Sequence, residues 1–266
     1  MNFLHFYQPN PIFLNLGFIQ IRWYGVFVSL AILACLFLAL KLAKKQNISS
    51  DQIYDLAIWL VVGGVVGARL YEVFVINWFY YAGNLWAIFK IWQGGLAIHG
   101  ALIGGAIAVV FWSKKNKHDF WQLADLIAVV MPLGQAIGRW GNYFNQELFG
   151  RPTTWPVGLS IAENNRPLGL ENYSYFQPVF LYESVLNLFL FFGLLFVFKK
   201  LNSSKGTVAV LYLLGYSVIR FFMEFVRLDP TPVLWWLRLP QLVSLVIFVL
   251  AGLFLVRKKA INFLFG

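Results

Sequence analysis

Seven apolar stretches in the sequence are each close to the length of a membrane-spanning helix. About 20 mostly apolar residues are needed to cross the roughly 30 Å hydrocarbon core of a bilayer, because a helix rises about 1.5 Å per residue. Asp125 and Pro132 interrupt the fourth stretch, which makes it the weakest. The chain is therefore predicted to be an all-α, polytopic membrane protein with about seven transmembrane helices. The stretches are Ile21–Leu42, Ile53–Val75, Gly95–Trp112, Phe120–Ile137, Val179–Phe198, Thr207–Phe225 and Pro240–Val256.

The composition fits a membrane protein better than a soluble one. Apolar residues make up 60% of the chain and charged residues 12%, whereas a soluble domain has about 25% charged residues. The formal net charge of +10 does not indicate nucleic-acid binding, because the basic residues lie between apolar runs and form no single patch. Without a linker or an internal repeat, we expect one integral membrane domain over residues 1–266, with an interfacial arm at residues 1–20.

Lysine clusters predict how the chain is oriented in the membrane. Basic residues in short loops favour the cytoplasmic side, and the clusters follow the first, third, fifth and seventh stretches, which are alternate loops. The N-terminus is then expected outside and the C-terminus in the cytoplasm, with residues 138–178 forming a small extracytoplasmic connection. The clusters are Lys41, Lys44 and Lys45, then Lys114, Lys115 and Lys117, then Lys199, Lys200 and Lys205, and finally Arg257, Lys258 and Lys259.

The arginines are distributed differently, since Arg257 alone lies in a lysine cluster. Arginine keeps its charge when partly buried and offers a planar fork of donors to phosphate or carboxylate, so the remaining arginines indicate an anion-handling site. An alternative is that some of them only pair with nearby acids or extend to lipid headgroups. We favour that alternative for Arg22, Arg166 and Arg238.

Several ionisable residues fall inside the predicted helices, where a charge costs at least about 2.5–3.5 kcal/mol near the bilayer centre. Arg69 and Glu72 are three residues apart, and Arg220 and Glu224 are four apart, so each pair shares a helical face. One interpretation is that these pairs are internal ion pairs whose single role is to dock helices. Arg220, Glu224 and Arg139 are all expected towards the outer leaflet, where they could converge on a ligand.

The third stretch begins with glycines around His99. Gly100 and Gly104 form a small-xxx-small pair, which permits close approach of another helix. Histidine titrates near neutral pH and can accept a proton. A histidine at a helix crossing can also be just a hydrogen-bond partner, but the surrounding glycines leave room for a substrate. We therefore expect His99 to act in catalysis or in substrate contact.

Residues 138–150 hold the densest group of polar side chains. Arg139, Asn142, Asn145 and Glu147 occur here together with three glycines. Amides can bind phosphate oxygens or hydroxyl groups, and glycines let a ligand approach the backbone. A purely structural turn would not need so many hydrogen-bonding groups. The segment therefore predicts a binding site.

No metal or cofactor is predicted. Cys35 is the single cysteine, and the sequence has neither a zinc-binding H-E-x-x-H helix nor an acidic cluster suited to Mg²⁺.

Five segments in order resemble the phosphatidylglycerol:prolipoprotein diacylglyceryl transferase family of bacterial inner membranes. The most specific is the run GRWGNYFNQE at 138–147, which is similar to the family's G-R-x-G-N-[FY]-x-N-x-E. The run HGALIG at 99–104 resembles H-G-G-L-I-G, with Ala101 in place of a glycine. The other three are RWYG at 22–25, QPVFLYE at 177–183 and RFFME at 220–224. The resemblance covers nearly the whole chain.

The resemblance implies that the diacylglyceryl group of phosphatidylglycerol moves to the lipobox cysteine thiol of a preprolipoprotein. A thioether would form and glycerol 1-phosphate would be released, in the first step of bacterial lipoprotein maturation. The implied partners are phosphatidylglycerol, signal peptides with a lipobox cysteine and membrane lipids, without nucleic acid. The implied location is the bacterial cytoplasmic (inner) membrane, as a multi-pass protein.

The chemistry of that reaction suggests roles for particular residues. The thiolate is the nucleophile, and His99 is the leading candidate for the base that forms it. Arg139 and Arg220 are expected to hold the leaving phosphate. Glu224 is expected to orient Arg220, whereas Glu183 and Asp125 are interpreted as structural. The lipid headgroup is expected to bind Tyr24, Asn142, Asn145 and Glu147 together with the two arginines.

A transporter for an anionic lipid or solute is the alternative function. Transporters commonly contain repeated halves with broken helices in corresponding positions. This sequence shows no such repeat, which favours the transferase.

Overall fold

The computed structural model describes residues 7–17, 20–200 and 205–265, with residues 258–265 described by their backbone. The chain forms two compact units. One contains the chain up to Cys35 and from Ile127 onward, and the other is Leu36–Leu126. Helices α2 (Trp23–Ala43) and α6 (Phe120–Asn145) each pass from one unit to the other. Parts of the predicted N-terminal arm, residues 1–6 and 18–19, lie outside the described residues.

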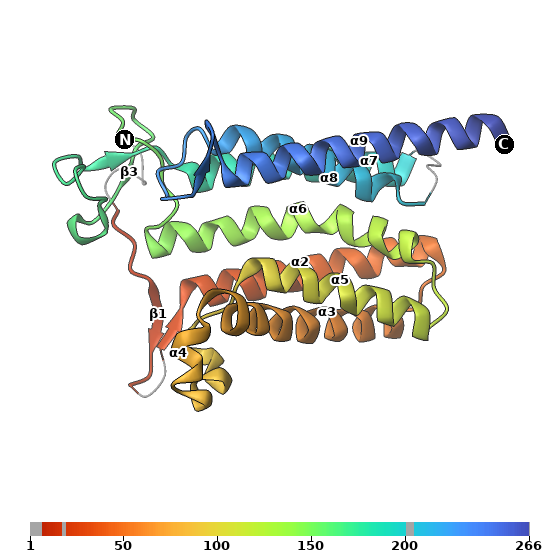
Figure 1. Ribbon diagram of the computed structural model, residues 1–266, viewed down its shortest axis with the longest axis horizontal. Coiled ribbons are helices and arrows are strands. Elements are labelled where there is room, and N and C mark those ends of the chain that lie inside the picture. Colours follow the sequence, from red (N-terminus) through yellow and green to blue (C-terminus); the bar gives the residue numbers. More distant parts are fainter. Residues whose placement is uncertain (1–6, 18–19, 201–204, 266) are drawn as a thin grey trace. The chain divides into compact units, whose positions relative to one another are not determined.

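The unit Leu36–Leu126 is built on a close pair of helices, which lie side by side in Figure 1. Helix α3 (Ser50–Tyr71) begins with a capping box between Ser49 and Gln52 and continues as a π-helical turn, η2 (Glu72–Ile76). Helix α5 (Ile98–Lys115) packs against it. Short helices make up most of the connection between them: α4 (Trp78–Ala82), η3 (Leu85–Phe89) and η4 (Ile91–Gln93). A further short helix, η1 (Lys44–Gln46), precedes α3.

Glycines bring α3 and α5 into backbone contact. A Cβ atom on Gly104 would collide with the carbonyl oxygen of Gly63, and one on Gly100 would collide with that of Gly67. The predicted small-xxx-small pair on α5 is thus confirmed. Its partner is the Gly63–Gly67 pair on α3, which has the same four-residue spacing.

Arg69 does not form the pair with Glu72 that their spacing suggested. Its guanidinium donates instead to the backbone carbonyls of Ala87, Ile88, Gly94 and Gly95. Because buried carbonyls need hydrogen-bond donors, this buried arginine ties the backbone of the connection between α3 and α5 to helix α3.

The other unit contains α6 together with three helices that run alongside one another in Figure 1: α7 (Val179–Lys200), α8 (Thr207–Met223) and α9 (Leu239–Phe265). Three two-stranded antiparallel sheets accompany them in the described chain. They are β1 (Ile12–Asn15) with β2 (Gln20–Arg22), β3 (Leu159–Ser160) with β4 (Tyr175–Phe176), and β5 (Val233–Leu234) with β6 (Leu237–Arg238). A short helix, η5 (Glu163–Asn165), lies between β3 and β4.

A buried aromatic cluster connects the end of α6 to the connection that follows it. Tyr143 of α6 and Phe180 of α7 have ring centroids 5.0 Å apart. Phe149, Leu159, Ile161 and Phe176 complete the cluster. The cluster therefore fixes residues 143–180 as a packed structure on the end of the helices.

Helix α6 is longer than the sequence suggested. The predicted stretch ended at Ile137, but the helix continues to Asn145 with Pro132 inside it. Transmembrane helices tolerate proline because neighbouring groups satisfy the freed backbone atoms. Arg139, Asn142 and Asn145, which were expected in the connection, therefore lie on the last turns of α6.

Five of the described helices are long and apolar enough to cross a membrane, which makes the protein a helical multi-pass membrane protein. These are α2 with η1, α3 with η2, α6, α7 and α9. Helix α8 is apolar but has 17 residues, and α5 has 18. The count of seven spans and the predicted orientation remain predictions.

Candidate functional site

Two buried carboxylates, Glu183 and Glu224, are each shared by two arginines. The Glu183 side chain is 3% exposed and that of Glu224 is fully buried. A buried charge needs partners because its desolvation costs several kcal/mol. Four arginines supply those partners from three different segments of the chain.

Glu183 lies just after the first turn of α7, between Arg139 and Arg227. Its Oε2 pairs with Nη2 of Arg139, and its Oε1 lies 3.2 Å from Nη1 of Arg227. Arg227 is paired a second time, because its Nε lies 2.6 Å from Oδ2 of Asp229. Positive and negative side chains therefore alternate along these contacts, and no two like charges are paired directly.

Glu224, the residue that follows α8, lies between two arginines in the same way. Its Oε2 lies 2.7 Å from Nη1 of Arg220, the predicted i, i+4 pair. Its Oε1 lies 3.3 Å from Nη1 of Arg238 and accepts a hydrogen bond from Thr231. The pairing expected for Arg220 and Glu224 is confirmed. Arg238 does pair with an acid, one of the two arrangements expected for it, and whether that is its whole role stays a prediction.

The two groups are joined through Arg238. Its Nη1 donates to the backbone carbonyl of Arg227 at 2.9 Å as well as to that of Glu224. A continuous network therefore connects Arg139 with Arg220. We call it the arginine network, and it comprises Arg139, Glu183, Arg227, Asp229, Arg238, Glu224 and Arg220.

Electrostatics keep Arg227 charged within this network. Burial by itself would lower the pKa of Arg227, but the negative charges of Glu183, Asp229 and Glu224 raise the pKa above its ordinary value. The guanidinium is thus a fixed positive charge at any physiological pH.

The amide residues of α6 form a second group beside Arg139. Nη1 of Arg139 approaches Oδ1 of Asn142 at 3.4 Å, and Nδ2 of Asn142 donates to Oε1 of Glu147 at 2.8 Å. Nδ2 of Asn145 reaches the same oxygen at 3.3 Å. Glu147 is exposed, so its carboxylate is open to a ligand while one oxygen is held by two amides.

Tyr24, in the first turn of α2, lies against this part of α6. A Cβ atom on Gly141 would be 2.8 Å from Cδ2 of Tyr24, so the glycine is what permits the contact. Tyr24 is 40% exposed. It therefore packs against the helix that carries Arg139 and Asn142 while keeping part of its side chain accessible.

Gln146 fixes the chain that follows α6, and the sequence did not single it out. It has a positive φ of 51°, and its amide donates to the carbonyl of Pro9. Its Oε1 accepts from the backbone of Ala162 and from the side chain of Asn165. One buried side chain thus joins three segments. The positive φ ends the helix directly before Glu147.

His99 belongs to the other compact unit, in the first turn of α5. Its ring centroid is 5.9 Å from that of Tyr71, and its side chain is exposed. The remaining predicted site residues lie in one unit, where Tyr24, Arg139, Asn142, Asn145 and Glu147 are neighbours and Arg220 with Glu224 joins them through the arginine network.

Glu183 and Arg227 were not among the predicted site residues. Their separation of 44 positions hides the contact, since spacing reveals partners only within one helix. One feature of the sequence did point to such a contact. Glu183 lies near the start of an apolar helix and has no cation within four positions, so its partner must come from another segment.

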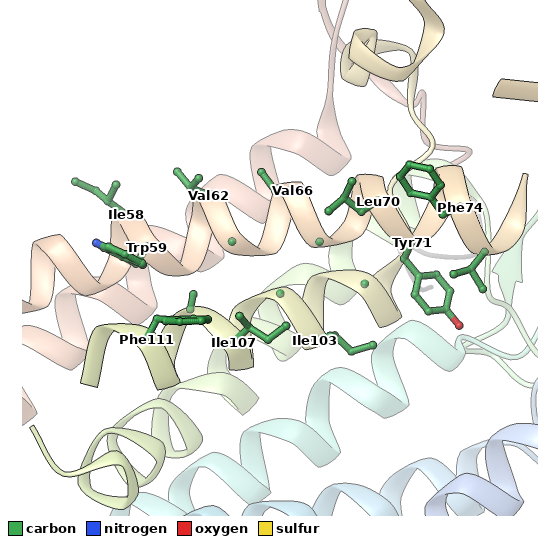
Figure 2. A pocket seen from close by; sticks show the side chains of 16 residues that line it. Ile58, Trp59, Val62, Val66, Leu70, Tyr71, Phe74, Ile103, Ile107 and Phe111 are labelled. Carbon is green, nitrogen blue, oxygen red and sulfur yellow. The ribbon is translucent and has the colours of Figure 1, made fainter. Parts of the chain in front are cut away.

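A groove of about 730 Å³ lies along α3 and α5. Figure 2 shows side chains that line it, among them those of Ile58, Val62, Val66 and Leu70 on α3 and of Ile103, Ile107 and Phe111 on α5. Glycines of the helix contact line it as well, and it has no charged side chain. It can therefore receive apolar groups but cannot hold an anion. Within the described residues, no group of three histidine, cysteine or acidic side chains is placed to bind a metal.

Fold and site together define a helical, multi-pass membrane protein with partly exposed arginines held by buried carboxylates. Guanidinium donors of this kind can bind carboxylate or phosphate groups. Comparison with known proteins narrows the class. Residues 11–257 match the family described as prolipoprotein diacylglyceryl transferase.

Curated relatives agree with this match. The phosphatidylglycerol–prolipoprotein diacylglyceryl transferase of Acaryochloris marina is 47% identical over 91% of this chain and 88% of its own length. The enzyme of that name from Synechocystis is 46% identical, covering 93% and 89%, and that from Gloeobacter violaceus is 44% identical, covering 93% and 92%. The chain belongs to the prolipoprotein diacylglyceryl transferase family.

Proposed function

We propose that this protein is the transferase that moves the diacylglyceryl group of phosphatidylglycerol to a prolipoprotein. The observation that carries the proposal is the family match over residues 11–257, together with two partly exposed arginines, each paired with a buried carboxylate. The alternative of a membrane transporter is not favoured, because the curated relatives are transferases.

The proposed acceptor is the lipobox cysteine thiol of the prolipoprotein. A thiol has a pKa of about 8.5, so it must lose its proton to become an effective nucleophile. The thiolate sulfur then bonds to the glyceryl carbon that carries the phosphate. The carbon–oxygen bond breaks, and its electron pair leaves with glycerol 1-phosphate. The product is a thioether.

Arg139 and Arg220 would hold the phosphate in this reaction. Their side chains are 20% and 19% exposed, so each retains surface for a ligand while paired with its carboxylate. Guanidinium groups stabilise the charge that grows on the leaving oxygen, because their donors are in place before the bond breaks. Beyond the phosphate, the phosphatidylglycerol headgroup ends in an uncharged glycerol whose hydroxyl groups suit Glu147, Asn142, Asn145 and Tyr24.

His99 would accept the thiol proton. This assignment predicts that His99→Gln lowers turnover by about 10²–10⁴-fold, the usual contribution of general base catalysis, while leaving the protein folded in the membrane. The measurement is the transfer rate of the purified variant, with its unfolding temperature as control. Near-normal turnover would remove His99 as the base.

The proposed location is the bacterial cytoplasmic membrane, with about seven spans, the N-terminus outside and the site facing outward. The lysine clusters support this orientation. An outward site would meet prolipoproteins after their signal peptides have entered the membrane.

A transfer assay tests the proposed function. The purified protein is incubated with phosphatidylglycerol and a peptide containing a lipobox, and the peptide mass is followed. We expect a diacylglyceryl mass gain on the cysteine, and no gain when that cysteine is serine. No mass gain with the intact cysteine peptide and a folded protein would contradict the proposal.

A further inference from the structure

Glu183 is placed to control Arg139, although its sequence position suggested only a structural acid. Its carboxylate is almost fully buried, and each oxygen faces a different arginine. A carboxylate that contacts two guanidinium groups fixes the plane of each, because every contact restricts the direction of a planar fork. The orientation of Arg139 therefore depends on Glu183 and, through it, on Arg227.

Arg227 braces this arrangement and is not available to bind a ligand. Its side chain is 9% exposed, its Nη1 faces Glu183 and its Nε faces Asp229. Arg139 is different, because Glu183 is its one acidic partner in the described chain and its contact with Asn142 is long, at 3.4 Å. A guanidinium has five N–H donors, so Arg139 keeps donors for a phosphate.

Helices α6 and α7 are also joined independently of the Glu183 carboxylate. The hydroxyl of Ser184 donates to the carbonyl of Ala136 at 2.9 Å, and Trp140 packs edge-on against Phe180. Neutralising Glu183 should therefore leave the two helices docked. This separates a role in helix docking from a role in orienting Arg139.

We propose that Glu183 is a positioning residue of the transfer reaction, the shared counter-ion that sets the orientation of Arg139, with Arg227 as its brace. The inference rests on the proposed function, because it assigns Arg139 to the lipid phosphate. Glu224 holds Arg220 in the same way, with Arg238 as the second arginine. Arg139 and Arg220 thus each pair with a buried carboxylate that a second arginine also contacts.

Neutralising Glu183 should have opposite effects on anion binding and on turnover. Glu183→Gln removes a negative charge beside Arg139, so the site attracts phosphate anions more strongly. The same change releases the orientation of Arg139, so the phosphate is held less well in the transition state. A structural role would weaken binding and turnover together.

The experiment uses the full-length protein and measures kcat, KM for phosphatidylglycerol and inhibition by added glycerol 1-phosphate. For Glu183→Gln we expect kcat to fall about tenfold to a hundredfold, the size expected from a misplaced catalytic group. KM should not rise, and glycerol 1-phosphate should inhibit at lower concentration. Glu183→Asp keeps the charge but shortens the side chain, so its kcat should fall while inhibition stays at the wild-type level.

Ser184→Ala is the matched control, because it removes a bond between α6 and α7 without changing charge. Its kcat and inhibition should stay close to those of the wild type. The inference is overturned if Glu183→Gln keeps wild-type kcat, or if its kcat, its inhibition by glycerol 1-phosphate and its unfolding temperature all decline together. An inactive but folded wild-type protein would instead overturn the proposed function.

Discussion

At the scale of single residues, the site depends on how buried charges are paired. Removing one partner of a buried ion pair leaves an unpaired charge and is usually strongly destabilising, whereas each carboxylate here has two arginine partners. The second arginine lets the first keep part of its surface exposed. Arg139 and Arg220 can therefore remain paired and still meet a ligand.

Gly141 offers a residue-scale prediction about Tyr24. Alanine at this position would bring its Cβ to 2.8 Å from Cδ2 and 3.2 Å from Cα of Tyr24, so Tyr24 must move. We expect Gly141→Ala to raise KM for phosphatidylglycerol severalfold. Steady-state transfer rates over a range of lipid concentrations measure this.

Gly138 provides the matched control for that substitution. It lies about one turn earlier on α6, and a Cβ atom there would meet no neighbouring group within 4 Å, so Gly138→Ala should leave KM unchanged. Replacing glycine by alanine inside a helix stabilises the helix by up to about 1 kcal/mol, so this control should not lower the unfolding temperature. Equal KM values for both variants would show that Tyr24 does not contact the lipid.

The sequence identified part of the site at this scale. The Arg220–Glu224 pair could be predicted because its partners are four positions apart on one helix. Glu183 was interpreted as structural because its arginine partners come from other segments, and the contacts of Arg69 with loop carbonyls were hidden for the same reason. Contacts between distant segments depend on how helices pack, and helix spacing does not reveal them.

At the scale of elements, the α3–α5 pair depends on glycines that face each other. Gly104→Ala would place a Cβ against the carbonyl oxygen of Gly63 and 3.0 Å from Cα of Gly67. Backbone atoms cannot move aside as a flexible side chain can, so we expect a loss of about 1–3 kcal/mol of stability, as for other overpacked sites. The unfolding temperature in detergent measures this loss.

Gly105, the next residue of α5, tests whether the effect belongs to the helix contact. A Cβ there would meet just the tip of Leu60 at 3.8 Å, an ordinary contact distance. Gly105→Ala should therefore be neutral or slightly stabilising. If both variants were destabilised alike, close packing of α3 and α5 would not be the cause.

The elements were largely predictable from apolar length, but their ends were not. Helix α6 passes Pro132 and Gly138, which are typical breakers in soluble proteins, and ends only where Gln146 adopts a positive φ. Membrane helices tolerate such residues, so composition alone placed the end eight positions too early. The structure thereby moves the amide group from a loop onto a rigid helix.

At the scale of the whole molecule, the lysine clusters predict how the protein is oriented in the membrane. Leu168 lies in the predicted extracytoplasmic connection and is 98% exposed, so a cysteine there should react with an impermeant maleimide in intact cells. A cysteine at Lys45, in a predicted cytoplasmic cluster, should react only after permeabilisation. Both are placed in a variant in which Cys35 is replaced by alanine. The reverse labelling pattern would invert the orientation.

In the proposed reaction, phosphate held by arginines leaves as the acceptor sulfur bonds to the diacylglyceryl carbon. The most direct measurement is to quantify both products of the same reaction, the lipid-modified peptide and free glycerol 1-phosphate. Because one phosphate leaves for each thioether formed, we expect equal amounts of the two products at every time point. Modified peptide without glycerol 1-phosphate, or release of free glycerol in its place, would contradict it.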